Sequence, residues 1–276
     1  MRALPDPTTS PPPIGSRLVL ERRTLVTGVV ALVPRAMEAA GFLVAFTERT
    51  GGISKGTYQS LNLGLRDGDN RAGVVENRRR VARGLGVESF ACAQQTHGAR
   101  RTRIGSTRSG AGFLDRAGAV PDTDCLETTT TGLALAIFTA DCVPVALADP
   151  VAGRLTLVHA GWRGIAGGIL PVALEAFPDP AGIKAAVGPA IGPDHYEVRE
   201  EVALAVSSAA GAAMTERRSG GLRLDLPGTV AGILERLGVR SIERSEDCTA
   251  CQADRFFSRR RDGETGRQGM IALRLG

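Results

Sequence analysis

A cysteine and a histidine, Cys142 and His159, lie on either side of a short turn. Two apolar runs separated by turn residues at 149–152 are typical of a β-hairpin. With that four-residue loop, Ala148 pairs with Gly153, and the same register places Cys142 opposite His159. Directly opposed residues point to the same face, with Cβ atoms about 5 Å apart. We therefore predict that this thiol and imidazole are neighbours, either as a nucleophile with its base or as two ligands of one metal.

His97 is the candidate for a third member of this group. It follows an apolar run at residues 89–95 and precedes a glycine. Like Cys142 and His159 it therefore lies at a strand end, where functional side chains collect. Three nitrogen and sulfur donors without an evident fourth match a catalytic zinc site, which keeps one position open for water or substrate. A histidine beside an apolar strand can equally be a hydrogen-bonded core residue, but the hairpin favours the site because it brings two members together.

Composition limits the classes of partner. The chain has 276 residues, 43% of them hydrophobic, enough to bury a full core. The net charge of +5 comes from arginines, since Lys55 and Lys184 are the only lysines. The arginine cluster at residues 78–80 is expected on a solvated helix face. An aromatic content of 4% supplies few platforms for stacking single-stranded bases. We therefore expect no nucleic-acid partner.

Cysteine usage and hydropathy indicate the compartment. Five cysteines, an odd number in a chain of this length, argue against a disulfide framework and for a reducing environment. No run approaches the roughly 18 apolar residues that a membrane span needs. We expect a cytoplasmic protein without a membrane partner. Residues 1–35 begin with a segment rich in Pro, Thr and Ser and are expected to form a poorly ordered extension. The domain is expected to span residues 36–276.

Short apolar strands alternate with segments of helical spacing, and no repeat or linker divides the chain. This pattern predicts the α/β (α+β) class, as a single domain of mixed β-sheets flanked by helices. We expect a monomer or a small homo-oligomer. The expected strands are residues 42–46, 89–95, 133–139, 183–187 and 223–226, and the expected helices are residues 72–85, 164–177, 200–213 and 229–237.

Nine motifs between residue 46 and residue 267 stand in the order of one known family. They are FTERTGG (46–52), SLNLG (60–64), QTHG (95–98), TADC (139–142), HAGWRG (159–164), GPAIG (188–192), CTAC (248–251), FFSRRRDG (256–263) and TGR (265–267). By these motifs the chain resembles the multicopper polyphenol oxidase, or laccase-domain, family, also called peptidoglycan editing factor or purine nucleoside phosphorylase. The resemblance runs from about residue 40 to the C-terminus.

The resemblance implies a fold shared with cysteine hydrolases and cytotoxic-necrotizing-factor-like domains. It also implies one zinc ion held by His97, Cys142 and His159, with copper as the less favoured metal. The implied activities are phosphorolysis of adenosine, inosine and 5′-methylthioadenosine, together with deamination of adenosine. The partners are then a purine nucleoside and phosphate. Zinc could activate water for attack on C6 of adenine.

Further residues of the motifs are candidates for catalysis or substrate binding. Cys142 and Asp141 are candidate catalytic residues, Asp141 as a group that orients a ligand or moves a proton or, alternatively, as a turn cap. Because arginine forks bind phosphate bidentately, the motif arginines are candidate phosphate ligands, with surface ion pairs as the alternative. The full prediction adds Arg49 and Gln95 to the catalytic group and assigns Asn62, Arg163, Arg260, Arg261 and Arg267 to substrate or phosphate binding.

Two other functions remain open at this point. Cys142 could attack a peptidoglycan-type amide with His159 as its base, or the zinc could be structural in a domain that acts through partners. Oxidase chemistry needs several coppers and is the least favoured. Cys248 and Cys251 form a C-x-x-C pair, but no second pair lies at zinc-knuckle spacing, so we interpret them as packing thiols. His195 is interpreted as a turn residue.

Overall fold

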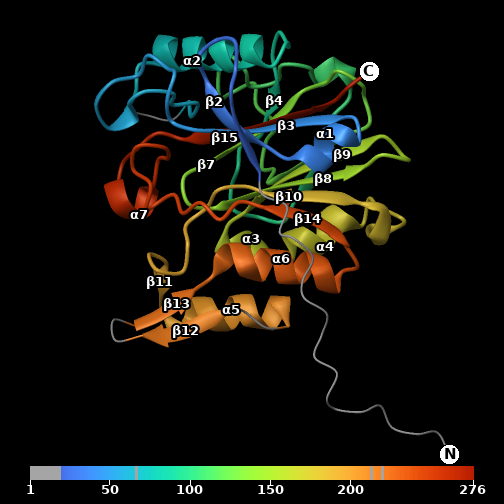
Figure 1. Cartoon of the computed structure of the whole chain (residues 1–276), viewed down its shortest axis with the longest axis vertical. Helices are drawn as coiled ribbons and strands as arrows, with labels where there is room; N and C mark the ends of the chain where they lie inside the picture. The colour runs from blue at the N-terminus through green and yellow to red at the C-terminus, as the bar shows by residue number, and fades with distance from the viewer. Residues whose placement is uncertain (1–19, 66–67, 212–213, 219–220) are drawn as a thin grey trace, which may run out of the picture.

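The computed structural model describes residues 20–65, 68–211, 214–218 and 221–276 (Figure 1). Two six-stranded sheets form its centre. In the first sheet the order is β1 (Glu21–Thr24), β2 (Val30–Val33), β3 (Phe42–Thr47), β15 (Gln268–Arg274), β7 (Leu135–Thr139) and β4 (Ala91–Cys92). In the second it is β14 (Ser241–Arg244), β10 (Lys184–Val187), β8 (Val143–Asp149), β9 (Arg154–Ala160), β6 (Cys125–Thr128) and β5 (Arg101–Arg103).

Both sheets are mixed. β7 and β4 run parallel at one edge of the first sheet, while its other neighbours are antiparallel. The second sheet has a parallel pair at each edge, β10 with β14 and β5 with β6. A third, three-stranded sheet contains β11 (Glu197–Val198), β13 (Gly221–Leu224) and β12 (Thr215–Arg218). The predicted class of mixed sheets flanked by helices is confirmed.

Helices cover the outer faces of the two large sheets, as Figure 1 shows. One face carries α2 (Arg71–Gly84), and the opposite face carries α3 (Trp162–Ala166), α4 (Ile169–Leu174) and α6 (Leu226–Arg236). Beyond these lies α5 (Glu200–Ala210), next to the third sheet. The remaining helices are α1 (Arg35–Ala39) and α7 (Arg259–Asp262), with 3₁₀ turns η1 (Gly56–Tyr58), η2 (Ser106–Arg108) and η3 (Pro180–Gly182).

The side chains of each central strand point alternately to its two faces, and each face packs into a different hydrophobic core. In β3, Val44 and Phe46 face the core between the sheets, whereas Ala45 faces the core under α2. In β8, Val143 and Val145 face the helices, whereas Ala146 faces the first sheet. Because successive strand residues point to opposite faces, a strand covered on both sides must be apolar throughout. The continuous apolar runs in the sequence therefore mark the strands of a four-layer helix–sheet–sheet–helix arrangement.

The N-terminal boundary differs from the expected one. Within the expected poorly ordered extension, β1 and β2 form instead, and β2 pairs with β3. Ala31 enters the core under α2, and Leu32 enters the core between the sheets. Burial of alternate side chains of β2 in these two cores stabilises the strand. Residues 1–19 of the expected extension lie outside the described residues.

Two other expectations are corrected by local backbone chemistry. The helix expected over residues 164–177 is divided into α3 and α4 where Gly168 adopts a left-handed conformation, with φ of 81°. The hairpin register is also shifted, because Pro144, not Cys142, lies opposite His159. The loop is residues 150–153: Asp149 pairs with Arg154, and Gly153 supplies the positive φ that ends the turn. Moving the loop by one residue shifts the register by two, which keeps side chains on the same face.

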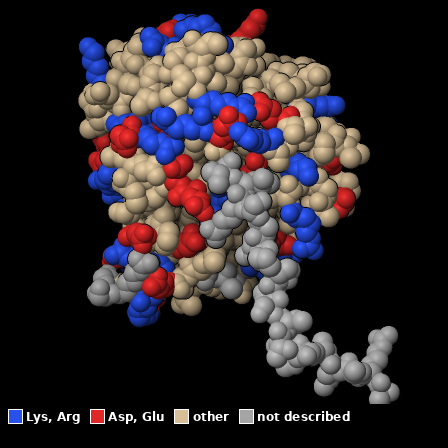
Figure 2. Space-filling model, in the orientation of Figure 1, with Lys and Arg blue, Asp and Glu red and all other residues tan. Residues whose placement is uncertain are grey.

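Arg78 contradicts the expectation of a solvated arginine face. Its guanidinium is buried and donates to the carbonyl oxygens of Leu63, Gly112 and Phe113 at 2.6–2.9 Å. Arg79, the next residue on α2, is exposed. Figure 2 shows basic side chains beside acidic ones on one face of the molecule. Among the ion pairs of the structure, Arg23 lies 2.7 Å from Glu38. No helix in the described ranges is long and apolar enough to cross a membrane.

Candidate active site

The site forms where the chain passes from one large sheet to the other. His97 lies between β4 of the first sheet and β5 of the second, and Cys142 lies between β7 of the first sheet and β8 of the second. His159 is near the end of β9 in the second sheet. The two sheets therefore jointly position the group. Despite the shifted register, the structure brings all three predicted ligands together.

The donor atoms of His97, Cys142 and His159 lie within 4.8 Å of one another. Cys142 Sγ is 3.7 Å from His97 Nε2, and the two imidazole centroids are 4.7 Å apart. With Zn–S near 2.3 Å and Zn–N near 2.0 Å, tetrahedral coordination separates a sulfur and a nitrogen ligand by about 3.5 Å. The donor set and its spacing thus fit a metal of zinc size and softness, and copper also accepts these donors.

Asp124 organises this group, and the sequence analysis missed it. Its fully buried carboxylate accepts the Nδ1 proton of His159 at 2.7 Å. It also accepts the backbone N–H groups of Thr96, His97 and Gly98 at 2.8–3.1 Å. Because a carboxylate only accepts, Nδ1 of His159 carries the proton and Nε2 is left for a metal. The available signal was an acidic residue directly before a buried strand, which by itself is weak.

Electrostatics favour a thiolate at Cys142. Burial alone would raise the pKa of Cys142, but the charge of His159 and hydrogen bonds from both histidines lower it to about 6. Burial alone would lower the pKa of His159, whereas the Cys142 thiolate and Asp124 raise it to about 9. Burial alone would raise the pKa of Asp124, but the hydrogen bond with His159 outweighs burial and the pKa falls to about 2. A thiolate is the form of cysteine that binds a metal or attacks a substrate.

The backbone around the site is strained. Among the described residues, three that are not glycine have positive φ: His97 at 65°, Asp122 at 45° and Asp141 at 92°. Such conformations persist only where surrounding contacts hold them, and they cluster at functional sites. Gly161 leaves the space for the group, because a Cβ there would lie 2.9 Å from His97 Cδ2 and 3.1 Å from Cys142 Sγ.

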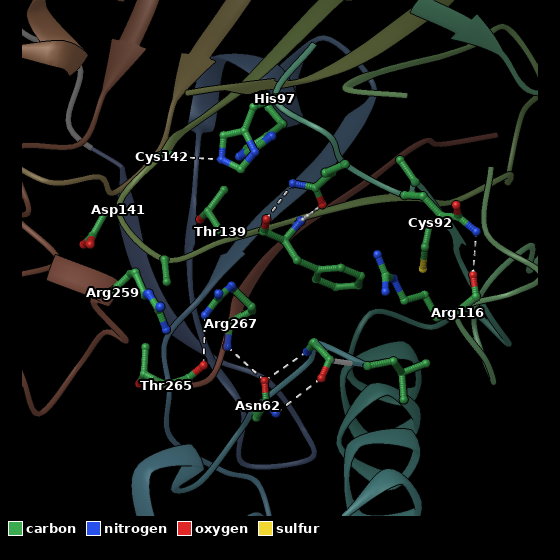
Figure 3. A pocket seen from close by; sticks show the side chains of 18 of the residues that line it. Asn62, Cys92, His97, Arg116, Thr139, Asp141, Cys142, Arg259, Thr265 and Arg267 are labelled. Atoms are coloured by element: carbon green, nitrogen blue, oxygen red, sulfur yellow. Dashed lines mark hydrogen bonds between the residues drawn. The ribbon is translucent and has the colours of Figure 1, made fainter. Parts of the chain in front are cut away.

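A cavity of about 780 Å³ opens beside the three residues. Its volume is within the range of about 300–1,000 Å³ that is typical of small-molecule sites. His97, Cys142 and His159 form part of its wall, and Figure 3 shows His97 and Cys142 at one end of it. Arginines line the cavity from several segments: Arg78, Arg116, Arg259, Arg260 and Arg267. In Figure 3, Arg259 and Arg267 lie on one side and Arg116 on the other.

Five other predicted residues line this cavity: Asp141, Gln95, Asn62, Arg260 and Arg267. Several also hold its wall together. Asp141 accepts the Thr249 hydroxyl and the Arg260 N–H, each at 2.7 Å. Gln95 makes two hydrogen bonds with the backbone of Phe138, at 2.7 and 2.9 Å. The buried Asn62 accepts the Arg267 N–H at 2.9 Å (Figure 3). Their catalytic or substrate-binding roles remain predictions.

Three predicted arginines do not line the cavity. Arg49 donates to the carbonyl oxygens of Gln59 and Ala253 and stacks on Phe257. Arg261 donates to the carbonyl oxygens of Thr249, Ala250 and Phe256 and pairs with Asp262. Arg163 is exposed over the Trp162 ring. These three arginines therefore lie apart from the residues that line the cavity, and their catalytic or phosphate-binding roles remain predictions.

The cavity also contains residues that the sequence analysis did not select. Arg259 lies in the same arginine run as two selected residues, so its neighbours were a usable signal. Arg116 lies in a glycine-rich stretch, and nothing in its local sequence distinguishes it. Tyr196 lies beneath the guanidinium of Arg260, with 5.0 Å to the ring centroid. Burial raises the pKa of Tyr196 to about 12, so its hydroxyl stays protonated.

The family can now be assigned by comparison. Residues 43–274 match the family model described as multi-copper polyphenol oxidoreductase laccase. The chain belongs to this family. The resemblance seen in the motifs is thereby confirmed.

Named relatives and solved structures agree with this family. The chain is 40% identical over 242 residues to "Purine nucleoside phosphorylase YlmD" of Geobacillus stearothermophilus, which covers 83% of this chain and 88% of that protein. It is 42% identical over 228 residues to "Purine nucleoside phosphorylase SCO2081" of Streptomyces coelicolor, covering 80% and 91%. The crystal structure of the Geobacillus YlmD superimposes with a TM-score of 0.83 at 39% identity, covering 89% of this chain and 96% of that one. A Bacillus licheniformis hypothetical protein YfiH gives a TM-score of 0.82 at 32% identity, with the same coverage.

Proposed function

We propose that this protein is a zinc-dependent purine nucleoside phosphorylase that acts on adenosine, inosine and 5′-methylthioadenosine and also deaminates adenosine. One observation carries the proposal: His97, Cys142 and His159 form the wall of a cavity of about 780 Å³ that is also lined by arginines. The names of relatives that are 40–42% identical support the same activity.

In phosphorolysis, a phosphate oxygen forms a bond to C1′ of the ribose while the bond from C1′ to the purine nitrogen breaks, and the purine gains a proton. The phosphate must be held against the ribose, and arginine forks suit this task. We assign it to Arg116, Arg259 and Arg267, whose side chains line the cavity from both sides (Figure 3). The protonated hydroxyl of Tyr196 supplies a hydrogen-bond donor for the substrate.

Zinc would be held by His97, Cys142 and His159, where it would supply Lewis-acid chemistry and an activated water for the deamination. Asp124 fixes the tautomer of His159 and the backbone at His97, so the three donors stay aligned. Gln95 and Asn62 hold the neighbouring walls in place. The chain thus provides a rigid set of donors beside a site for an anion.

Incubation of zinc-loaded protein with adenosine, with and without phosphate, tests the proposal. Adenine and ribose 1-phosphate are expected only with phosphate. The deaminase activity is expected to give inosine without phosphate, and inosine together with hypoxanthine with phosphate. Absence of ribose 1-phosphate from adenosine, inosine and 5′-methylthioadenosine alike would refute the phosphorylase assignment. Absence of inosine from the incubation without phosphate would refute the deaminase assignment alone.

A peptidoglycan-directed cysteine hydrolase is the second candidate. The lowered pKa of Cys142 and the raised pKa of His159 describe a thiolate–imidazolium pair, which is typical of cysteine nucleophiles. This candidate predicts that metal-free protein cleaves muropeptide amides and that Cys142→Ser abolishes the cleavage. Cleavage without any nucleoside turnover would favour it over the phosphorylase.

A further inference from the structure

A second group of histidine and cysteine side chains, of the types that bind metals, lies outside the cavity. The donor atoms of His195, Cys248 and Cys251 lie within 4.8 Å of one another. His195 Nδ1 is 3.4 Å from Cys251 Sγ and 3.9 Å from Cys248 Sγ. None of these residues lines the cavity. From the sequence, the histidine is expected to be a turn residue and the cysteines packing thiols, but the fold brings them together from segments more than 50 residues apart.

The spacing fits tetrahedral coordination of a small cation. Around zinc, neighbouring sulfur and nitrogen ligands are about 3.5 Å apart, and two sulfur ligands about 3.8 Å apart. The sulfur–nitrogen distances of 3.4 and 3.9 Å bracket the first value. A C-x-x-C pair joined by a distant histidine is, in addition, a donor set that zinc prefers.

Backbone contacts preorganise the group. Cys248 forms a parallel bridge with Ala190, and the Thr249 N–H donates to the Ala190 carbonyl at 3.0 Å. The Gly192 N–H donates to Cys248 Sγ at 3.2 Å. A hydrogen bond of this kind stabilises negative charge on the sulfur, as in the outer shell of a metal–thiolate site. The donors are therefore held in place by contacts that do not themselves require a metal.

We propose that His195, Cys248 and Cys251 form a second metal site, which takes a thiophilic divalent cation such as Zn²⁺. His195 and Cys251 are exposed and Cys248 is half-buried, so the fourth coordination position is open to water. The site is structural: it joins the loop before β11 to the loop before α7. Figure 1 shows these two elements on the same side of the molecule.

The site supports the cavity through two residues. Asp141, next to Cys142, accepts the hydroxyl of Thr249, which lies between the two cysteines in the sequence. Arg260 donates to the carbonyl oxygen of Glu197, the first residue of β11 and two positions after His195. A cation that clamps the two loops therefore fixes the cavity wall that carries Arg260 and Tyr196.

Metal stoichiometry tests the second site. Zinc-loaded protein, desalted and analysed by mass spectrometry for metal, should contain two zinc ions per chain. Cys251→Ser and His195→Asn should each contain one, while Ala253→Ser, an exposed change in the same loop, should retain two. The same zinc content in the wild type, Cys251→Ser and His195→Asn would overturn the proposal.

Cobalt spectroscopy separates the two sites. In a Cys142→Ser background, which removes the thiolate of the first site, one equivalent of Co²⁺ should still give thiolate-to-cobalt charge-transfer absorption. Adding Cys251→Ser should remove at least half of it. No such absorption in the Cys142→Ser background would overturn the proposal. A thiol assay on unreduced, unfolded protein should find five free thiols, and three would instead indicate a Cys248–Cys251 disulfide and contradict the metal site.

Discussion

Asp124 is the residue on which the geometry of the candidate active site depends. Its carboxylate accepts a hydrogen bond from the imidazole of His159. It also accepts hydrogen bonds from three consecutive backbone N–H groups, one of which belongs to His97. Two of the three candidate metal ligands are thus aligned by a residue that does not line the cavity. Asp124 is a positioning residue in this account. Loss of its carboxylate should weaken metal binding more than it lowers the stability of the fold.

Asp124→Asn tests this role. The amide matches the carboxylate in size but loses the charge and can accept at only one atom. Zinc affinity should fall about 10- to 100-fold, the usual cost of losing a partner of a metal ligand. Competition with a chromogenic chelator measures it. Asp122→Asn is the matched control, because Asp122 is an exposed carboxylate of the same loop. Equal zinc affinity in both variants would contradict the role of Asp124.

Variants of Arg116 and Arg163 test whether phosphate binding depends on an arginine in the cavity or only on positive charge at the surface. Arg116 lines the cavity, whereas Arg163 is exposed outside it. Arg116→Gln should raise the KM for phosphate about 10- to 100-fold, corresponding to charge-assisted hydrogen bonds worth about 1.5–3 kcal/mol. Arg163→Gln should leave this KM within about twofold. Steady-state phosphorolysis at saturating nucleoside measures both. An unchanged KM in Arg116→Gln would remove this arginine from the phosphate site.

At the scale of elements, α2 secures one wall of the cavity through Arg78. This buried guanidinium joins the loop at Leu63 to the glycine-rich stretch at Gly112 and Phe113, and stacks on Phe138. An arginine in a helix is usually solvated, so the sequence alone suggests the opposite arrangement. The difference arises because two loops without regular structure leave carbonyl groups that only a buried donor can satisfy.

Arg78→Met should destabilise the protein by about 3 kcal/mol or more, because it leaves several buried carbonyl groups without a donor, each worth roughly 1–3 kcal/mol. Denaturant unfolding monitored by circular dichroism gives the free energy. Arg79→Met, one position along the same helix and exposed, should change stability by less than about 0.5 kcal/mol. A similar loss in both variants would show that Arg78 has no special structural role.

The strands show which elements the sequence could predict. Expected strands at residues 42–46 and 183–187 and the helix at 72–85 closely match β3, β10 and α2, because their apolar periodicity is set by burial. Short edge strands such as β5 were missed, since pairing with β6 rather than hydrophobic spacing defines them. Cys142, His97 and His159 were found from residue type and position at strand ends. Asp124 and Arg116 were not, because their roles depend on contacts between distant segments.

At the scale of the molecule, the candidate active site lies at the junction of two sheets. Cys142 and His97 each follow a strand of the first sheet, and His159 belongs to the second. A metal bound there links both halves of the core. Ligand binding to the native state stabilises it by about 2.7 kcal/mol when free ligand exceeds its Kd 100-fold. Metal should therefore contribute to global stability.

Removal of metal by a chelator should lower the Tm by roughly 5–10 °C, given about 2–4 °C per kcal/mol for a chain near this size. Differential scanning calorimetry measures the shift, and restored zinc should reverse it. In Cys142→Ser the same treatment should produce a smaller shift. Identical Tm values for metal-loaded and metal-free wild-type protein would contradict the link between the sheets.

The most direct test of the central claim is zinc titration into metal-free protein while ribose 1-phosphate formation from adenosine and phosphate is followed. The account predicts no turnover before addition, a rise that saturates as His97, Cys142 and His159 are filled, and no turnover at any zinc concentration in Cys142→Ala. Full phosphorolysis by the metal-free wild type, or wild-type rates in Cys142→Ala, would contradict it.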